Sequence, residues 1–177
     1  MRVNPTDTMP ALDAELVGGG AWRLPEEQGA RLAVIAFFHG LYCPLCRIWI
    51  GELDRLVPEF VRRGTSVIAL TCDTRARAER LLQDWGLAHL RVGAALDPED
   101  ARKAGLYLSE GRGRHPETGI EAPLLCCEPG VLAVCDDGTL YAAWTQSVPY
   151  ARPHWPEILT ALERFLARGL PEPPGAA

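Results

Sequence analysis

Two cysteines stand three positions apart in the segment FFHGLYCPLCRIW, at Cys43 and Cys46. An apolar run, RLAVIAFF at residues 31–38, comes before them, and apolar residues recur at steps of three and four from Leu45 onward. This change of period predicts a strand, a short loop and then an amphipathic helix that ends at Gly64. The pair is therefore expected where the chain enters the helix.

This position predicts a chemistry for the pair. Cys43 is expected at the N-cap, with Pro44 at the first helical position, where a missing N–H does no harm. The free backbone N–H groups and the positive end of the helix dipole favour a thiolate, so the pKa of Cys43 should be lowered. Cys46 follows one turn later on the same face, within reach of a disulfide. The spacing predicts an exposed nucleophile with a resolving thiol beside it, as thiol–disulfide exchange requires.

A single C-x-x-C pair is also compatible with half of a zinc site or with two packed core residues. A structural zinc needs two further ligands at suitable spacing, whereas the four histidines are scattered along the chain. No metal and no cofactor is therefore expected. The other cysteines are interpreted as small buried apolar residues, and the sequence assigns no role to them: Cys72, Cys126, Cys127 and Cys135.

Length and composition limit the class of protein. A chain of 177 residues suits one domain, with its core at about residues 12–168 and a disordered proline-rich tail at 171–177. The net charge of -5 argues against nucleic-acid binding. No segment has the length of a signal peptide or a membrane span, so a cytoplasmic location without membrane contact is expected. In that reducing compartment, a close cysteine pair is more often catalytic, redox-sensing or metal-binding than structural.

The order of the predicted elements indicates an α/β protein. Apolar strands alternate with amphipathic helices, which calls for parallel strands at the centre of a mixed sheet flanked by helices. A hairpin is expected at residues 11–24 and a second one around the Asp-Gly turn of CDDG, with a long loop between at 110–123. The predicted elements are strands at 31–38, 65–72 and 90–96, and helices at 45–64, 74–86, 98–104 and 156–169.

Three segments together resemble a known family. They are FFHGLYCPLCRIWIGEL, IALTCDTRARAE and EPGVLAVCDDGTLYAAWTQSVPYARP, the last with Pro129 directly before an apolar strand. They are similar to the peroxiredoxin-like branch of the alkyl hydroperoxide reductase and thiol-specific antioxidant family, within the thioredoxin superfamily. The resemblance covers about residues 12–168 and implies a thioredoxin-like fold. It implies that Cys43 reacts, that Cys46 resolves and that Pro129 faces the pair.

The chain departs from the P-x-x-x-T-x-x-C pattern of peroxiredoxins proper, because Ala36 and Gly40 stand at the Pro and Thr positions. This departure puts the usual peroxide pocket in question. Arg47 is a candidate for the arginine that such enzymes place beside the thiolate, with a solvated helix residue as the alternative.

Further residues are candidates for supporting the site. His39 and Tyr42 flank Cys43 and could donate hydrogen bonds to it or only shape the loop. Glu128 could relay protons from the pair or be a solvated surface carboxylate. A position at the rim of the site is expected for three more residues: Asp73, Arg152 and Pro153.

Three functions follow from these observations. The first is a thiol peroxidase, in which Cys43 reduces a peroxide and an external thiol reductant regenerates the enzyme. The second is a thioredoxin-like oxidoreductase, in which the pair exchanges with a disulfide substrate. The third is a redox-sensing or interaction module without turnover. A homodimer is possible, because a partner could cover the apolar hairpin edge LYAAW.

Overall fold

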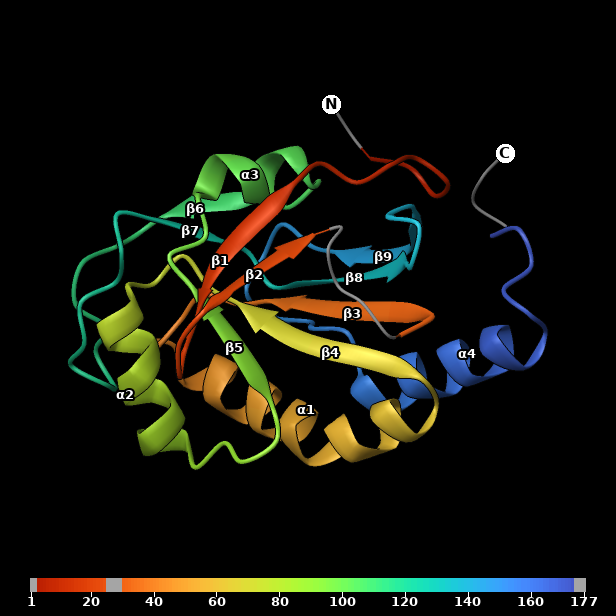
Figure 1. Cartoon of the computed structure of the whole chain (residues 1–177). Coiled ribbons are helices and arrows are strands. Elements are labelled where there is room, and N and C mark those ends of the chain that lie inside the picture. The colour runs from red at the N-terminus through yellow and green to blue at the C-terminus, as the bar shows by residue number, and fades with distance from the viewer. Residues whose placement is uncertain (1–2, 25–29, 174–177) are drawn as a thin grey trace.

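A seven-stranded sheet forms the centre of the computed structural model, which describes residues 3–24 and 30–173. The strands lie in the order β2-β1-β5-β4-β3-β8-β9, and β6 and β7 form a separate pair (Figure 1). The strands are β1 (Leu12–Leu16), β2 (Ala21–Leu24), β3 (Leu32–Phe37), β4 (Thr65–Leu70), β5 (Arg91–Ala94), β6 (Leu108–Glu110), β7 (Leu125–Cys127), β8 (Gly130–Cys135) and β9 (Leu140–Thr145).

Strand β3 lies at the heart of the sheet, and all six of its residues are buried. It runs parallel to β4 and antiparallel to β8, with Phe37 opposite Leu70 on one side and Gly130 on the other. The segments that follow β3 and β4 therefore meet the segment that precedes β8. They meet at the end of the sheet where β3 and β4 finish and β8 begins. In α/β proteins, functional residues usually lie at the carboxyl ends of the parallel strands.

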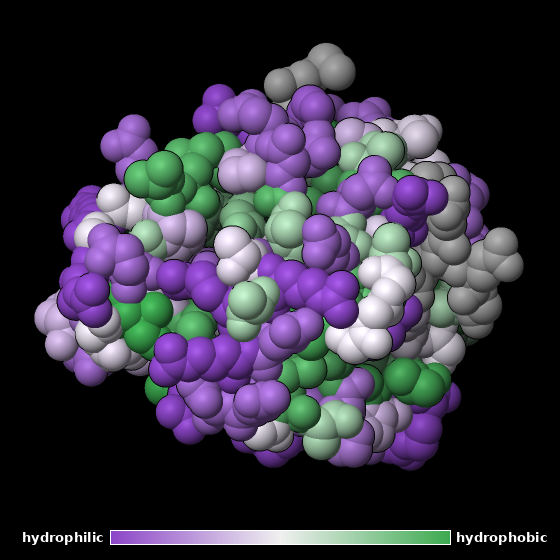
Figure 2. Space-filling model, turned by 60° about the vertical axis from the view of Figure 1, so that its left-hand side comes forward, coloured by the Kyte–Doolittle hydropathy of each residue, from purple (hydrophilic) through white to green (hydrophobic). Residues whose placement is uncertain are grey.

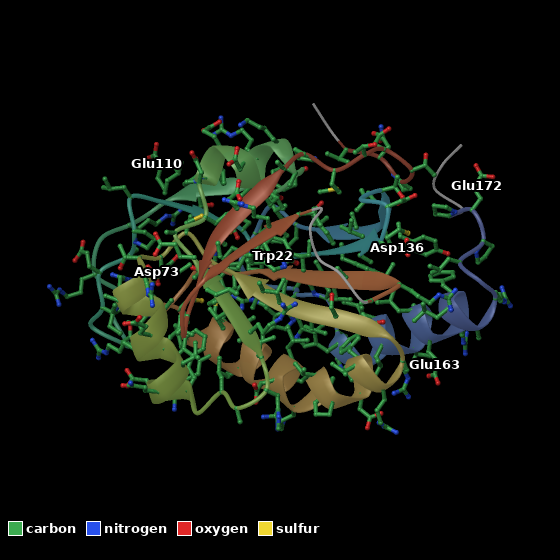
Figure 3. All side chains as sticks on the ribbon, viewed as in Figure 1. Trp22, Asp73, Glu110, Asp136, Glu163 and Glu172 are labelled. Carbon is green, nitrogen blue, oxygen red and sulfur yellow. The ribbon has the colours of Figure 1, made fainter. Side chains whose placement is uncertain are left out.

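Two layers of helices cover the sheet. Helices α1 (Pro44–Arg62) and α4 (Trp155–Ala167) lie along one face, and α3 (Pro98–Lys103) lies on the other (Figure 1). Helix α2 (Arg75–Trp85) packs on the α1 side, because its buried residues Ala78 and Leu81 share a core with those of α1. A second core, to which Trp22 belongs (Figure 3), lies on the face of the sheet that α3 covers.

The predicted α/β class and the mixed sheet flanked by helices are confirmed. The N-terminal hairpin is also present, because β1 and β2 pair antiparallel around the glycine turn. The hairpin of β8 and β9 lies as expected, with β9 at the edge of the sheet. The sequence did not predict β6 and β7, which flank the long loop, because each of these strands has only three residues. Of the predicted tail, residues 174–177 lie outside the described part of the chain.

The surface mixes polar and apolar side chains, as Figure 2 shows for one face. Within residues 3–24 and 30–173, no helix combines the length and the apolar character that crossing a membrane requires.

Helix α1 is fixed at two points along its length. Near its start, the rings of Trp49 and Trp155 stack with centroids 4.6 Å apart, and the Trp155 indole N–H donates to the Trp49 carbonyl at 2.9 Å. Further along, the buried Asp54 carboxylate accepts the backbone N–H groups of residues 88–90, two of them at 2.8 Å. These contacts join α1 to α4 and to the segment that leads into β5.

Asp54 provides a test of this anchoring. Asp54→Ala leaves three backbone N–H groups without their acceptor, so we expect a loss of about 2–4 kcal/mol in the free energy of unfolding. Asp54→Asn retains one oxygen acceptor and should lose roughly half as much. Urea unfolding followed by tryptophan fluorescence measures both losses. Equal stability of Asp54→Ala and the wild type would contradict this role.

Candidate active site

Cys43 caps the N-terminus of α1, as the sequence predicts. Its backbone is extended, with φ -94° and ψ 111°, and its Sγ accepts the backbone N–H of Cys46 at 3.4 Å. Pro44 occupies the first helical position. Hydrogen bonds from the Cys46 thiol, from His39 and from the Cys46 backbone N–H lower the pKa of Cys43 to about 3, against the opposing effect of burial. The site therefore holds a thiolate at neutral pH.

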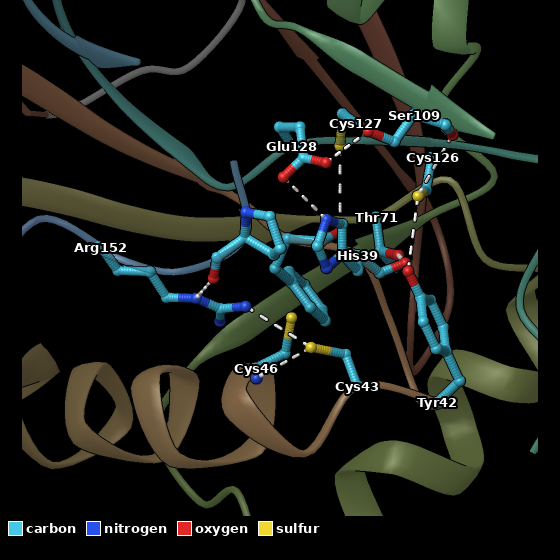
Figure 4. A network of polar contacts seen from close by, with 12 residues as sticks. His39, Tyr42, Cys43, Cys46, Thr71, Ser109, Cys126, Cys127, Glu128 and Arg152 are labelled. Atoms are coloured by element: carbon cyan, nitrogen blue, oxygen red, sulfur yellow. Dashed lines mark hydrogen bonds and ion pairs between the residues drawn. The ribbon is translucent and has the colours of Figure 1, made fainter. Parts of the chain in front are cut away.

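His39 joins this thiolate to a buried carboxylate. Its Nε2 lies 3.1 Å from Glu128 Oε2, and both side chains are about 95% buried (Figure 4). The other ring nitrogen, Nδ1, lies on the side of the cysteines (Figure 4). Ser109 donates a hydrogen bond to Oε1 of the same carboxylate. Glu128 thus fixes the orientation of the imidazole that supports Cys43.

Arg152 approaches the same sulfur from the segment that precedes α4. Its Nη2 donates to Cys43 Sγ at 3.5 Å, and its Nε donates to the Pro149 carbonyl at 3.1 Å. The guanidinium lies 5.6 Å from the centre of the Trp49 ring, within the range of a cation–π contact. A positive charge therefore faces the thiolate and is held there by the Pro149 carbonyl and the Trp49 ring.

Cys46 is the buried member of the pair. Its side chain is fully shielded from solvent, and burial together with the neighbouring Cys43 raises the pKa of its thiol well above the ordinary value. The charge of Arg152 acts in the opposite direction. The two cysteines thus differ in protonation at neutral pH: Cys43 is the anion, and Cys46 is the thiol that donates a hydrogen bond to it.

The loop between β3 and Cys43 is held by the segment after β4. Asp73 lies two residues before α2 (Figure 3) and accepts the backbone N–H of Leu41 at 2.7 Å. Arg77 forms an ion pair with the same carboxylate at 2.7 Å. Gly40 has φ +126°, and a Cβ at this position would lie 2.1 Å from Asp73 Oδ2. Glycine is therefore required where the P-x-x-x-T-x-x-C pattern has threonine.

A pocket of about 210 Å³ leads to Cys43. Cys43 is only 6% exposed, so the expectation of an exposed nucleophile was wrong: the thiolate is a nearly buried part of the pocket lining. Several of the lining residues are apolar, and the long loop contributes Thr118 and Ile120 to the lining. The pocket is lined by Leu41, Cys43, Pro44, Arg47, Asp84, Trp85, Thr118 and Ile120.

Two expectations for the supporting residues need correction. Arg47 is an exposed residue that lines the pocket, whereas Arg152 contacts the thiolate and is not merely at the rim. Glu128 is 3% exposed, which excludes a solvated surface carboxylate. Both corrections have one cause: the contacts join residues about 90 and 109 positions apart in the chain, which no local pattern indicates.

The remaining predicted residues are partly brought together. The Tyr42 hydroxyl lies 3.6 Å from Cys126 Sγ, so its polar group faces that thiol instead of Cys43. Pro129 is buried directly before β8, and its place opposite the pair stays a prediction. Pro153 accepts the Trp49 indole N–H at 2.8 Å through its carbonyl. Ser109 was missed, because a lone serine in a short strand carries no sequence signal.

The zinc alternative has some geometric basis. Among the described residues, His39, Cys43 and Cys46 offer ligand atoms within 4.8 Å of one another. A structural zinc takes four protein ligands, and the guanidinium of Arg152 adds a positive charge beside this group. The expectation of no metal stays a prediction.

The comparisons with known proteins agree with this geometry. The AhpC/TSA family model matches residues 5–120. No curated protein matches the chain significantly. A peroxiredoxin-like protein from Aquifex aeolicus is similar in structure, with a TM-score of 0.73 at 13% identity over 94% of this chain and 89% of that one.

Two further solved structures resemble this chain to a similar degree. A cysteine-to-serine mutant of peroxiredoxin 6 from Arenicola marina has a TM-score of 0.73 at 18% identity, over 94% of this chain and 75% of its own. AhpC from Mycobacterium tuberculosis has a TM-score of 0.72 at 12% identity, over 93% of this chain and 99% of its own. At these low identities, the TM-scores show that the chain shares the fold of these structures.

The chain belongs to the AhpC/TSA family, and the predicted peroxiredoxin-like membership is confirmed. This membership supports a thiol-dependent oxidoreductase, and thiol peroxidase activity in particular. Cys43 and Cys46 lie inside the matched region, whereas Glu128 and Arg152 lie beyond it. Part of the environment of the thiolate thus comes from a segment outside the match.

His39→Gln tests the support of the thiolate. One amide can pair with Glu128 but cannot also reach Cys43, so the pKa of Cys43 should rise by at least about one unit toward its ordinary value of 9.0. With a raised pKa, less Cys43 is thiolate at acidic pH. Alkylation of Cys43 by iodoacetamide should therefore slow at low pH and change little at pH 8. The exposed His89→Gln is the matched control. An unchanged pH profile in His39→Gln would refute the contact.

Gly40→Thr tests the departure from the family pattern. The new side chain would collide with Asp73 at a positive φ, so we expect a loss of about 2–4 kcal/mol in stability and no gain in peroxide reactivity. Gly19→Ala shares a positive φ but meets nothing within 4 Å, and should cost about 1 kcal/mol. Thermal unfolding of both variants gives the comparison. A Gly40→Thr protein as stable as the wild type would show that the loop is not confined.

Proposed function

We propose that this protein is a thiol peroxidase in which Cys43 reduces a peroxide and Cys46 resolves the oxidised form. The observation that carries the proposal is the Cys43 thiolate in the lining of a pocket, with Arg152 donating to its sulfur at 3.5 Å. A nucleophilic thiolate beside a fixed positive charge suits attack on an O–O bond, because negative charge moves onto the leaving oxygen.

The reaction has two chemical steps. The Cys43 thiolate attacks one oxygen of the peroxide, the O–O bond breaks, and Cys43 becomes a sulfenic acid while the leaving alkoxide or hydroxide takes up a proton. The Cys46 sulfur then attacks the Cys43 sulfur, and water leaves as the disulfide forms. Two equivalents of an external thiol reductant return the pair to its reduced state and become a disulfide.

Two neighbouring groups are suited to assist. Arg152 Nη1 is buried and has no hydrogen-bond partner among the described residues, so it can donate to a peroxide oxygen. His39 contacts Cys43 and is held by Glu128, which places a proton donor near the leaving oxygen. Tyr42 and Arg47 would shape the loop and the pocket mouth, and Pro129 would close the site near Glu128.

Disulfide exchange is the second candidate. It is favoured by Gly40 at the threonine position and by the hydrogen-bonded contact of Cys43 with a fully buried Cys46 one turn away. The same Cys43–Cys46 disulfide would result, with a disulfide substrate in place of the peroxide. We further propose a cytoplasmic protein with one domain over residues 1–177, which can pair with a second copy through the edge strand β9.

Stopped-flow mixing of the reduced protein with hydrogen peroxide or cumene hydroperoxide tests the proposal. Wild type should react far faster than a free thiol, and Cys43→Ser should not react. Arg152→Gln should slow the reaction about 100-fold, as removal of one aligned donor does elsewhere. Cys46→Ser should retain the first step and accumulate a sulfenic acid at Cys43, visible by intact mass.

Cys135→Ser, which changes a thiol at the far end of β8, is the matched control and should behave as the wild type. A wild-type rate equal to that of a free thiol would reject the peroxidase. Rapid reduction of insulin in the same preparation, lost in Cys43→Ser, would then establish disulfide exchange. Formation of the disulfide without turnover of either substrate would establish a sensor.

A further inference from the structure

Closure of a disulfide between Cys43 and Cys46 requires a base for Cys46. The side chain of Cys46 is fully shielded from solvent, and burial beside Cys43 raises the pKa of its thiol. Bulk water therefore cannot take this proton directly, although the thiolate is the form that attacks another sulfur. Arg152 donates to the neighbouring Cys43 sulfur, but a guanidinium stays protonated and cannot accept a proton. The proton has to pass to another group inside the site.

His39 is placed to be that base. One of its ring nitrogens and the sulfurs of Cys43 and Cys46 all lie within 4.8 Å of one another. Nδ1 is the nitrogen on the side of the two cysteines (Figure 4). Among the described residues, no carboxylate joins this group. A gap of this size closes to a hydrogen bond through a small movement of the side chains, or one water bridges it.

A buried carboxylate holds the opposite side of the imidazole. Nε2 of His39 lies 3.1 Å from Glu128 Oε2, and Ser109 donates a hydrogen bond to Oε1 of the same carboxylate. The backbone is fixed as well, because the Glu128 N–H donates to the Tyr107 carbonyl at 2.7 Å. A carboxylate on one ring nitrogen stabilises the positive charge that arises when the other nitrogen takes a proton. Ser109, Glu128 and His39 thus form a continuous line that ends at the two sulfurs.

We propose that His39 is the catalytic base that takes the proton of Cys46 when the disulfide closes. Glu128 and Ser109 are positioning residues, which act by holding the ring of His39. The inference rests on the proposed role of Cys46 as the resolving thiol. In the first step, the protonated ring gives its Nδ1 proton to the oxygen that leaves the peroxide. Nδ1 is then free to take the next proton.

The second step balances without an outside oxidant. Cys46 passes its proton to Nδ1 of His39, and the electron pair of its sulfur forms the bond to the Cys43 sulfur. The S–O bond of the sulfenic acid breaks, and the leaving hydroxide takes the proton from Nδ1 and departs as water. The Cys46 sulfur is oxidised and the sulfenic sulfur is reduced. When two external thiols later reduce the disulfide, one of their protons goes to Cys46 and the other returns to His39.

Methyl methanethiosulfonate tests this step without a peroxide. The small reagent transfers a methylthio group to a thiolate, so one equivalent at pH 8 should convert Cys43 into a mixed disulfide. Cys46 then displaces methanethiol, which carries away the proton. Acid quenching at increasing times, followed by intact mass, gives the rates at which the adduct forms and is lost. Cys43→Ser shows how much reagent the partly exposed Cys72 and Cys135 take up, and Cys46→Ser should retain the adduct.

His39→Gln separates the two rates. At pH 8 the adduct should form at close to the wild-type rate, because Cys43 is still a thiolate. Its loss should be about 100-fold slower, which is the contribution of a positioned general base. The exposed His89→Gln is the matched control and should behave as the wild type in both phases.

The positioning residues should affect the same phase. Glu128→Gln should slow the loss of the adduct at least about tenfold, because an amide cannot stabilise the charged ring as a carboxylate does. The exposed Glu110→Gln is its matched control. Ser109→Ala should slow the loss about threefold to tenfold, and Ser109→Thr, which keeps the hydroxyl, should restore it. Because Ser109 is partly exposed, these two variants test the line even where a buried substitution prevents folding.

Circular dichroism establishes which variants are folded. Loss of the adduct at the wild-type rate in folded His39→Gln would overturn the base. An unchanged rate in Glu128→Gln and Ser109→Ala, or no recovery in Ser109→Thr, would overturn the positioning roles. A wild-type adduct that persists as in Cys46→Ser would instead reject Cys46 as the resolving thiol, which is a failure of the proposed function itself.

Discussion

The structure depends on keeping a sulfur anion in a place that is almost closed to water. Cys43 is 94% shielded, and burial alone would favour the neutral thiol. The anion is retained because donors converge on it from three parts of the chain: the first turn of α1, His39 after β3, and Arg152 before α4. The fold serves chiefly to bring these donors to one point.

Each donor has its own support. Glu128 holds His39, the carbonyl of Pro149 and the ring of Trp49 hold Arg152, and Asp73 holds the loop that leads into the helix. Rigid support of this kind is what allows a site to act without rearrangement during reaction. It also explains why Gly40 replaces the threonine of the family pattern: the position next to Asp73 leaves no room for a side chain.

The sequence predicts the parts of this arrangement that are local. Periodicity located the strand–helix junction, and residue preferences placed Cys43 at the cap and Pro44 beside it, as the structure has them. It could not predict Arg152 beside the sulfur, because that contact spans 109 positions and depends on how the chain returns after β9.

The same limit applies to the burial of Glu128 and to its contact with His39, which follows β3. Such contacts are set by the register of β8 against β3, not by any pattern in one segment. The sequence therefore identified the reactive pair and its helix, while the residues that tune it became visible only with the fold.

The ionisation of Cys43 in the reduced wild-type protein tests the central claim most directly. Thiolate absorbance at 240 nm, measured from pH 2.5 to pH 10 as the difference between wild type and Cys43→Ser, reports this one group. The account predicts that the absorbance persists through neutral pH and is lost only as the pH falls toward about 3. A midpoint near the ordinary value of 9.0 would contradict it.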